Sequence, residues 1–418
     1  MGCSQGRTKP QRLEIKSTSR SQGEKSRVVQ IAVCLPEVVT LTAGEGGSRL
    51  ELWRLSDTEE LVRGRVFEPK EEQERVEVLK GVCAMKVGSG REEKRVLFSA
   101  AVVTSSDTVS SPSPPLSSLI HIWYLPHPFS IPSDQLELPA TDPVTSLSCL
   151  QDLLVALSPS WLYVWTCRLP GGRKSLYGSL VVTPAFQMSM GPTPLPGLVY
   201  LHAVDGTSQA EQREKSRVCG CAAGRKDPNP PNSRSTSLYA TIVMQEESEV
   251  THRFVVVNLR ANVSKEFAVA SPAITGVDML SASELLLGVY TEKYHCEVWK
   301  VSLAGEILAR VSFHTTSKRL SLNPMDKFLS TAASMSSQGS IKRRKLSAPI
   351  LAMTLDGLGV LWVLCADGFV AGFSSETMKK IGEYRVNIMC EVAVFAGKEG
   401  VFIGDKGGGV HRVTLPVL

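Results

Sequence analysis

The stretch "AGEGGSRLELWRL", residues Ala43–Leu55, carries the pattern that decides the fold. A turn of small residues is followed by an apolar strand with Trp53 near its end. Similar patterns return as "ALSPSWLYVWTCRL" at 156–169 and "GVYTEKYHCEVWKV" at 288–301. Short runs of Val, Leu, Ile and aromatic residues between Gly, Pro, Ser and Asp turns are typical of all-β folds. The repetition predicts one β-structured unit that is copied along the chain.

The spacing of these strands predicts the number of copies. Seven strands of this type can be aligned on one anchor residue each: Trp53, Trp123, Trp165, Val257, Trp299, Phe373 and Val413. The distance is 42 residues from Trp123 to Trp165 and from Val257 to Trp299, and 40 residues from Phe373 to Val413. A period of roughly 40–45 residues is that of a four-stranded propeller blade. We therefore expect an all-β protein with a single seven-bladed β-propeller.

The three longer gaps between anchors contain insertions. The segment 105–118 is rich in Ser and Pro, 205–235 is charged and rich in Gly and Pro, and 314–345 is rich in Ser and basic. Such compositions bury too little apolar area to offset the entropy of ordering the chain, and they predict long loops. We therefore assign the propeller to residues 27–418, with these insertions, and expect a disordered basic segment over residues 1–26.

The strand chemistry predicts sheets that are covered on both faces. In "LELWRL", Leu50 and Leu52 point to one face of the strand and Trp53 points to the other. We expect Trp53, Trp165 and Trp299 to lie between two blades. Residues 28–35, "VVQIAVCL", are expected to complete the last sheet and close the ring, because closure removes two exposed sheet edges.

The segment "VVTLTAGEGGSRLELWRL" resembles the WD40 repeat, in which a strand, a small-residue turn and a strand ending in Trp-Asp follow one another. "DLLVALSPSWLYVWTCRL" and "ELLLGVYTEKYHCEVWKVSLAGEI" are similar to it as well. Here Trp is followed by Arg54, Tyr124, Thr166 or Lys300 instead of Asp, so the resemblance is to a degenerate WD40-like propeller. "LGVLWVLCADGFVAGFSSETMKKIG" and "GVFIGDKGGGVHRVTL" also look like blades of the divergent propellers of signalling scaffolds and Rho exchange factors.

Charge and cysteine usage bound the setting of the protein. The chain has 46 Lys and Arg against 41 Asp and Glu, and no basic block with interleaved aromatic residues, so a specific nucleic-acid partner is not expected. Ten cysteines are scattered, and we find neither a secretory leader nor an apolar run long enough to span a bilayer. These features predict a reduced, cytoplasmic protein.

The N-terminus is a candidate for lipidation. In "MGCSQG", Gly2 could be myristoylated after removal of Met1, and Cys3 could then be palmitoylated. The myristoylation motif has Ser or Thr where this chain has Gly6. Peripheral membrane association through an acylated N-terminus and an ordinary unmodified N-terminus are the two alternatives.

The third insertion ends in a basic cluster, Lys342, Arg343, Arg344 and Lys345, which Ser347 follows. Such a cluster is typical of nuclear-import signals. Arg344, three residues before Ser347, also suits a basophilic kinase, whose phosphate would cancel much of the local charge. An import signal, a phosphorylation switch and a solvated spacer are the three alternatives.

No constellation in the sequence predicts an active site, a cofactor or a metal ion. Cys219 and Cys221 have C-x-C spacing without a second pair nearby. In "YHCEVW" (294–299), strand alternation sends neighbouring side chains to opposite faces. "GDKGGG" (404–409) is Gly-rich but has no following helix to complete a phosphate site, and is predicted to be a hairpin turn.

The sequence therefore favours a non-catalytic protein-interaction scaffold or complex subunit, with binding on loops and one propeller face. One alternative is a propeller enzyme whose residues converge on the central channel. Another is a regulatory module linked to small-GTPase signalling, which rests on the second likeness alone. Clustered Asp, His or Arg at the channel would favour the enzyme, and exposed apolar side chains would favour the scaffold.

Overall fold

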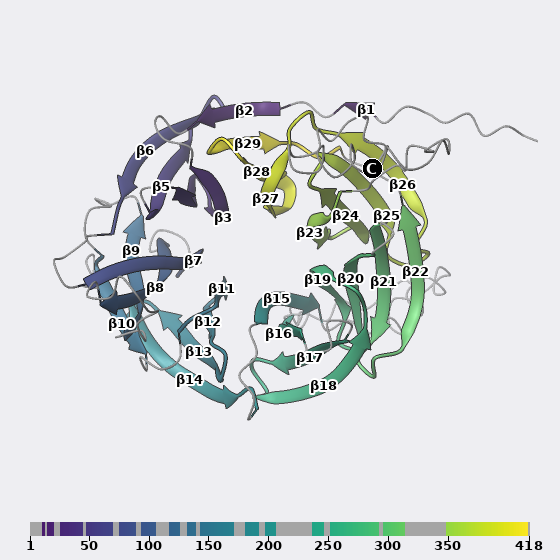
Figure 1. Ribbon diagram of the computed structural model, residues 1–418, viewed down its shortest axis with the longest axis horizontal. Helices are drawn as coiled ribbons and strands as arrows, with labels where there is room; N and C mark the ends of the chain where they lie inside the picture. Colours follow the sequence, from purple (N-terminus) through teal and green to yellow (C-terminus); the bar gives the residue numbers. More distant parts are fainter. Residues whose placement is uncertain are drawn as a thin grey trace, which may run out of the picture.

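Seven β-sheets are arranged in a ring around an open axis in the computed structural model (Figure 1). The structure describes residues 11–12, 15–20, 26–44, 47–69, 75–88, 93–105, 117–125, 132–138, 143–170, 180–191, 197–205, 236–245, 251–291, 296–313 and 348–416. The prediction of an all-β, seven-bladed propeller is confirmed.

The first four blades follow one another along the chain, and each is an antiparallel sheet whose strands run from the centre to the rim. Blade 1 consists of β3 (Arg27–Cys34), β4 (Glu37–Gly44), β5 (Gly47–Leu55) and β6 (Leu61–Phe67). Blade 2 consists of β7 (Arg75–Val87), β8 (Lys94–Ser105), β9 (Ser117–Leu125) and β10 (Asp134–Leu138). Blade 3 consists of β11 (Ser146–Leu150), β12 (Leu153–Leu157), β13 (Trp161–Arg168) and β14 (Val181–Ser189). Blade 4 consists of β15 (Gly197–Asp205), β16 (Thr236–Gln245), β17 (Thr251–Asn258) and β18 (Val263–Ala270).

The last three blades complete the ring, and two of them take strands from the N-terminus. Blade 5 consists of β19 (Ile274–Ser281), β20 (Glu284–Tyr290), β21 (Cys296–Ser302) and β22 (Ile307–Phe313). Blade 6 consists of β23 (Ile350–Leu355), β24 (Val360–Cys365), β25 (Phe369–Ser374), β26 (Lys380–Arg385) and the short β1 (Gln11–Arg12). Blade 7 consists of β27 (Cys390–Phe395), β28 (Val401–Asp405), β29 (Gly409–Val413) and β2 (Ile15–Arg20), with a 3-10 turn, η2 (Gly397–Glu399), after β27.

All seven anchor residues lie on the third strand of their blades, counted from the centre: β5, β9, β13, β17, β21, β25 and β29. Each anchor packs against the preceding blade, in one of seven hydrophobic clusters that the described residues form, one at each blade junction. Trp53, Trp165 and Trp299 are buried in this way, as predicted. The common orientation explains why one large apolar residue recurs at this position.

Blade 1 shows how both faces of a sheet are covered. Leu50 and Leu52 pack in the cluster that joins blade 1 to blade 2. Trp53, on the opposite face of the same strand, packs with Phe402 and Val410 of blade 7. The alternation of β5 therefore places one set of side chains in each neighbouring interface.

The ring closes differently from the expectation. Residues 28–34 belong to β3, the innermost strand of blade 1, and the prediction that they complete the last sheet is wrong. The closing strand is β2, which pairs antiparallel with β29, so Thr18 lies opposite His411 (Figure 1). The sequence predicts disorder for residues 15–20 because "IKSTSR" contains a single apolar residue. A rim strand needs few apolar residues, since it contributes backbone hydrogen bonds to an edge that is otherwise unpaired.

The closure is reinforced by a buried cation of blade 7. Arg412 is 4% exposed and its guanidinium contacts the carboxylate of Glu399 at 3.1 Å. It also contacts the carboxylate of Glu59, in the turn after β5 of blade 1, at 3.4 Å. The first and last blades are thus joined by an ion pair as well as by apolar packing.

The topology gives the ring two distinct faces. We call the face at which the innermost strands begin the upper face, and the face at which they end the lower face. Residues 106–116, between β8 and β9, and residues 314–347, between β22 and β23, connect strand ends on the upper face. Residues 206–235 connect β15 to β16 on the lower face. Nearly all of the three predicted insertions lies outside the described residues.

Among the described residues there is no helix whose length and apolar character would let it cross a bilayer.

Candidate functional site

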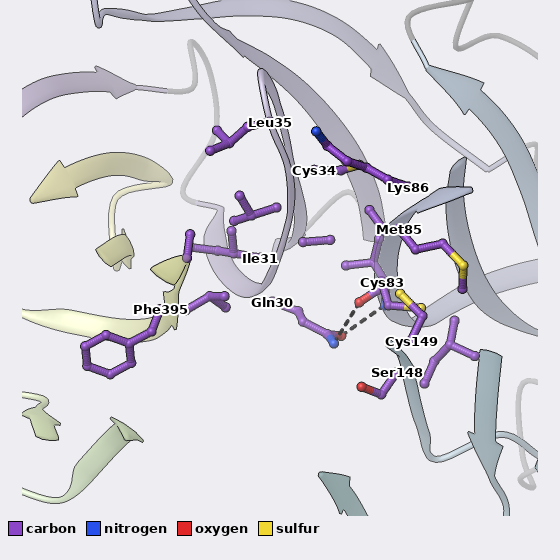
Figure 2. A pocket seen from close by; sticks show the side chains of 17 residues that line it. Gln30, Ile31, Cys34, Leu35, Cys83, Met85, Lys86, Ser148, Cys149 and Phe395 are labelled. Atoms are coloured by element: carbon purple, nitrogen blue, oxygen red, sulfur yellow. Dashed lines mark hydrogen bonds between the residues drawn. The ribbon is translucent and has the colours of Figure 1, made fainter. Parts of the chain in front are cut away.

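A cavity of about 530 Å³ opens in the central channel toward the lower face, between the innermost strands β27, β3, β7 and β11 (Figure 2). Its walls come from blades 7, 1, 2 and 3. Residues with chemically distinctive side chains in the wall are Gln30, Cys34, Cys83, Lys86, Cys149 and Phe395. The remaining wall is mostly Ala, Val, Leu, Ile and Met, so the cavity is largely apolar.

The side chain of Gln30 fixes the spacing between blades 1 and 2 at the cavity. Its Nε2 donates to the carbonyl of Val82 at 2.9 Å, and its Oε1 accepts from the amide of Val82 at 3.1 Å (Figure 2). The bond is possible because β7 has a register irregularity between Leu79 and Gly81, which leaves backbone groups of Val82 available to the neighbouring blade. Gln30 therefore acts as a substitute ladder partner between two sheets.

Blades 2 and 3 approach each other closely at the same level. A Cβ atom placed on Gly81 would lie 3.4 Å from the Cβ of Leu147 on β11. The absence of a side chain at Gly81 allows the innermost strands to come this near, which brings the side chains that follow in both strands into contact.

Three cysteines on consecutive innermost strands line the cavity. Burial raises the pKa of Cys34 to about 12 and raises the pKa of Cys83 well above that of an ordinary thiol. Cys83 and Cys149 share a hydrogen bond between their side chains. The two raised pKa values keep Cys34 and Cys83 as neutral thiols at physiological pH.

The charged side chain in the cavity wall is Lys86, whose Nζ lies 3.1 Å from the carboxylate of Glu93. A second ion pair nearby joins Glu37 of β4 to Arg95 of β8, and so links blades 1 and 2. Burial raises the pKa of Glu37, and the Arg95 guanidinium partly opposes that shift. These pairs bind the blades to each other and do not converge on a common point in the cavity.

Across the ring, the inner strands are joined by a polar contact centred on Asp278 of β19. One carboxylate oxygen lies 3.1 Å from Nδ1 of His202 on β15, and the other accepts the amide of Leu355 on β23 at 2.6 Å. Asp278 therefore bridges blades 4, 5 and 6, which is a structural task.

The Gly-rich segment 404–409 forms the turn between β28 and β29, as predicted. The carboxylate of Asp405 accepts hydrogen bonds from the amides of Gly407 and Gly409 and lies 2.8 Å from Nε2 of His411. Burial on its own would raise the pKa of Asp405, but these hydrogen bonds outweigh it and lower the pKa below the ordinary value. The carboxylate therefore organises the hairpin.

The structure brings none of the candidate residues chosen from the sequence to the cavity. The lipidation candidates Gly2 and Cys3 lie outside the described residues, as does the basic and phosphorylation cluster Lys342, Arg343, Arg344, Lys345 and Ser347.

The remaining sequence candidates are also explained by position or packing. Cys219, Cys221 and His295 lie outside the described residues as well. Cys296 and Glu297 point to opposite faces of β21, as alternation predicted: Cys296 is fully buried, whereas Glu297 accepts a bond from Trp299 Nε1 at 2.6 Å.

The cavity is the feature that sequence reasoning missed. Its cysteines stand in apolar strand-like runs, in which a cysteine is expected to be a small core residue. The available signal was their place on the strands that precede three successive anchors. Within the described part of the chain, no group of three or more His, Cys, Asp and Glu side chains is placed to hold a metal ion.

Comparison with known proteins places the fold among solved propellers. No protein-family model and no curated protein matches the chain. The WD40 β-propeller domain of Doa1 is similar over 97% of each chain, with 12% identity and a TM-score of 0.50. BBS1N, in a crystal structure with ARL6DN, is similar over 97% of this chain and 98% of its own, with 12% identity and a TM-score of 0.51.

At this level of identity the likeness concerns the fold alone. It agrees with the seven sheets and with the recurring third strand that each of them contains. The chain folds as a degenerate WD40-like seven-bladed β-propeller.

Proposed function

We propose that this protein is a non-catalytic interaction scaffold or complex subunit, and that it binds protein partners on the upper face of the ring. The observation that carries the proposal is a set of large apolar side chains exposed at that face. Leu198 and Val29 stand near the starts of two innermost strands, and Met389 stands in the turn before a third. Their exposed fractions are 53%, 39% and 49%.

The chemistry of the central channel supports a scaffold over an enzyme. An enzyme of this fold would gather acidic, basic or imidazole groups at the channel. The cavity wall is instead largely apolar, and its charged group, Lys86, is paired with Glu93. Exposed apolar residues at the channel mouth are typical of protein-binding surfaces.

The insertions add loops to the same face. Residues 106–116 and 314–347 both join strands at the upper face, and the second contains the basic cluster with Ser347. Loops on a rigid frame are the usual carriers of binding. The crystal structure in which the similar propeller BBS1N is in complex with ARL6DN supports a protein partner in the same general way.

Matched surface variants test the proposal. Leu198→Asp combined with Met389→Asp places two charges on the upper face, whereas Leu358→Asp alters the 74% exposed Leu358 in a lower-face turn. All variants should melt like the parent protein, since surface substitutions change stability by about 0.5 kcal/mol or less. Affinity capture with quantitative mass spectrometry should show partners that the double variant loses and Leu358→Asp retains.

Deletion of residues 316–344 separates the contribution of the loop. The deleted protein should melt nearly as before and should capture fewer partners, and the captured fraction should fall with salt if the basic cluster takes part. Equal capture by the parent, both surface variants and the deletion would contradict the assignment of binding to the upper face.

A further inference from the structure

Two pairs of cysteines in the ring share a hydrogen bond between their thiol groups. Cys83 of β7 contacts Cys149 of β11, across the junction of blades 2 and 3. Cys296 of β21 contacts Cys365 of β24, across the junction of blades 5 and 6. The two pairs differ in their access to solvent, which makes each a reference for the other.

The first pair is open to the channel. Both Cys83 and Cys149 line the cavity, and their sulfur atoms face each other in its wall (Figure 2). Cys149 is partly exposed, whereas Cys83 is 8% exposed. Cys296 and Cys365 are both 0% exposed and do not line the cavity.

The backbone geometry suits a covalent bond between the first pair. β7 and β11 are innermost strands of neighbouring blades and run in the same direction, and Cys83 and Cys149 come two residues after Gly81 and Leu147. A Cβ atom on Gly81 would lie 3.4 Å from that of Leu147. Disulfides have Cβ–Cβ distances of about 3.5–4.5 Å. Because side chains two residues apart share a face, the two strands hold Cys83 and Cys149 at a spacing that a disulfide spans.

We propose that Cys83 and Cys149 are a peroxide-sensitive thiol pair that forms a reversible disulfide between blades 2 and 3. The Cys149 sulfur, which the cavity exposes, attacks one oxygen of hydrogen peroxide; the O–O bond breaks, hydroxide leaves and becomes water, and Cys149 becomes a sulfenic acid. The Cys83 sulfur then attacks the Cys149 sulfur, the S–O bond breaks, and a second water leaves with the proton of Cys83. Two thiols and one peroxide thus give one disulfide and two waters.

The roles of the two sulfurs follow from their surroundings. Burial raises the pKa of Cys83, so this thiol stays protonated and unreactive toward solutes in the channel. It reacts when an oxidised sulfur is held in contact with it. Cys34 also lines the cavity, on β3, but burial raises its pKa to about 12, and the side-chain hydrogen bond of Cys83 is made with Cys149. The disulfide would fasten two blades together and change the wall of the cavity.

The experiment treats the reduced full-length protein with hydrogen peroxide and then blocks free thiols with N-ethylmaleimide. Peptide mapping without reduction should find a Cys83–Cys149 link, which dithiothreitol removes, and no Cys296–Cys365 link at the same dose. The thermal midpoint of the oxidised protein should rise, because the link restricts the unfolded chain. The parent protein itself is tested, so no variant needs to fold.

Two variants separate the chemical roles. Cys83→Ser should leave a sulfenic acid on Cys149 that a dimedone probe labels, whereas the parent should show little label. Cys149→Ser should leave Cys83 reduced. The proposal is overturned if peroxide links Cys34 to Cys149, links both buried pairs equally, or oxidises Cys149 in the parent without joining it to Cys83.

Discussion

The replacement Trp53→Ala removes the side chain that joins the first blade to the last. Trp53 is fully buried on β5, and its Nε1 donates a hydrogen bond to Oγ1 of Thr40 at 3.0 Å. Its ring packs with Phe402 and Val410 of blade 7, at the junction where the ring closes. Truncation therefore acts on the interface that holds the two ends of the chain together.

The expected loss has an apolar and a polar part. A buried tryptophan removes on the order of 200 Å² from water, worth about 5 kcal/mol at 25 cal/mol per Å². Alanine keeps part of that area, but a cavity is left, and measured Trp→Ala changes in cores cost about 3–5 kcal/mol. Trp53→Phe keeps most of the ring and loses the donor to Thr40, so it should cost roughly 1–2 kcal/mol.

Chemical denaturation followed by far-UV circular dichroism measures these losses, because the β-sheet signal reports the whole ring. Trp161→Ala is the matched control: Trp161 begins β13 and is 36% exposed, so its truncation should cost about 1 kcal/mol or less. The reasoning is refuted if Trp53→Ala unfolds at the same denaturant concentration as the parent, or if Trp161→Ala is the more damaging of the two.

Three further predictions concern closure, acid stability and turns. Deleting residues 1–20 removes the closing strand and should lower the thermal midpoint and promote association through the bare edge of blade 7, as size-exclusion chromatography would show, whereas deleting residues 1–10 should change neither. Because the folded pKa of Asp405 is lowered, its stabilisation is present above the ordinary carboxyl pKa and is lost as the pH falls through the folded value. Asp405→Asn should therefore lower the urea midpoint at pH 7 and differ progressively less from the parent below about pH 4. Gly368→Ala should destabilise by about 2 kcal/mol or more, since φ is 78° and the new Cβ would lie 2.1 Å from a carbonyl oxygen. Gly357→Ala, which meets nothing within 4 Å, should be neutral in the same melting assay.

The closing strand shows where sequence reasoning reached its limit. β3 and β2 are both near the N-terminus, and the more apolar of them was expected to close the ring. An innermost strand contacts neighbouring blades through both faces and must be apolar, whereas a rim strand such as β2 is held by backbone hydrogen bonds to β29. Backbone pairing leaves little trace in residue type, so "IKSTSR" gave no sign of its role.

The candidate site shows the same limit for side chains. Cys83 and Cys149 are 66 positions apart in the sequence, and nothing near either of them predicts the other. Their contact depends on the approach of two blades at Gly81 and on the bond from Gln30 to Val82, which are properties of the closed ring.

The sequence by itself determined the repeat, the number of blades and the position of the buried anchor in each. Those features follow from local alternation and from a period of about 40 residues, which any stretch of the chain displays. Only the tertiary structure decided which strand closes the ring, where the channel widens into a cavity, and which thiols meet in its wall. These depend on distances between blades, and blades meet through side chains and backbone groups that lie far apart along the chain.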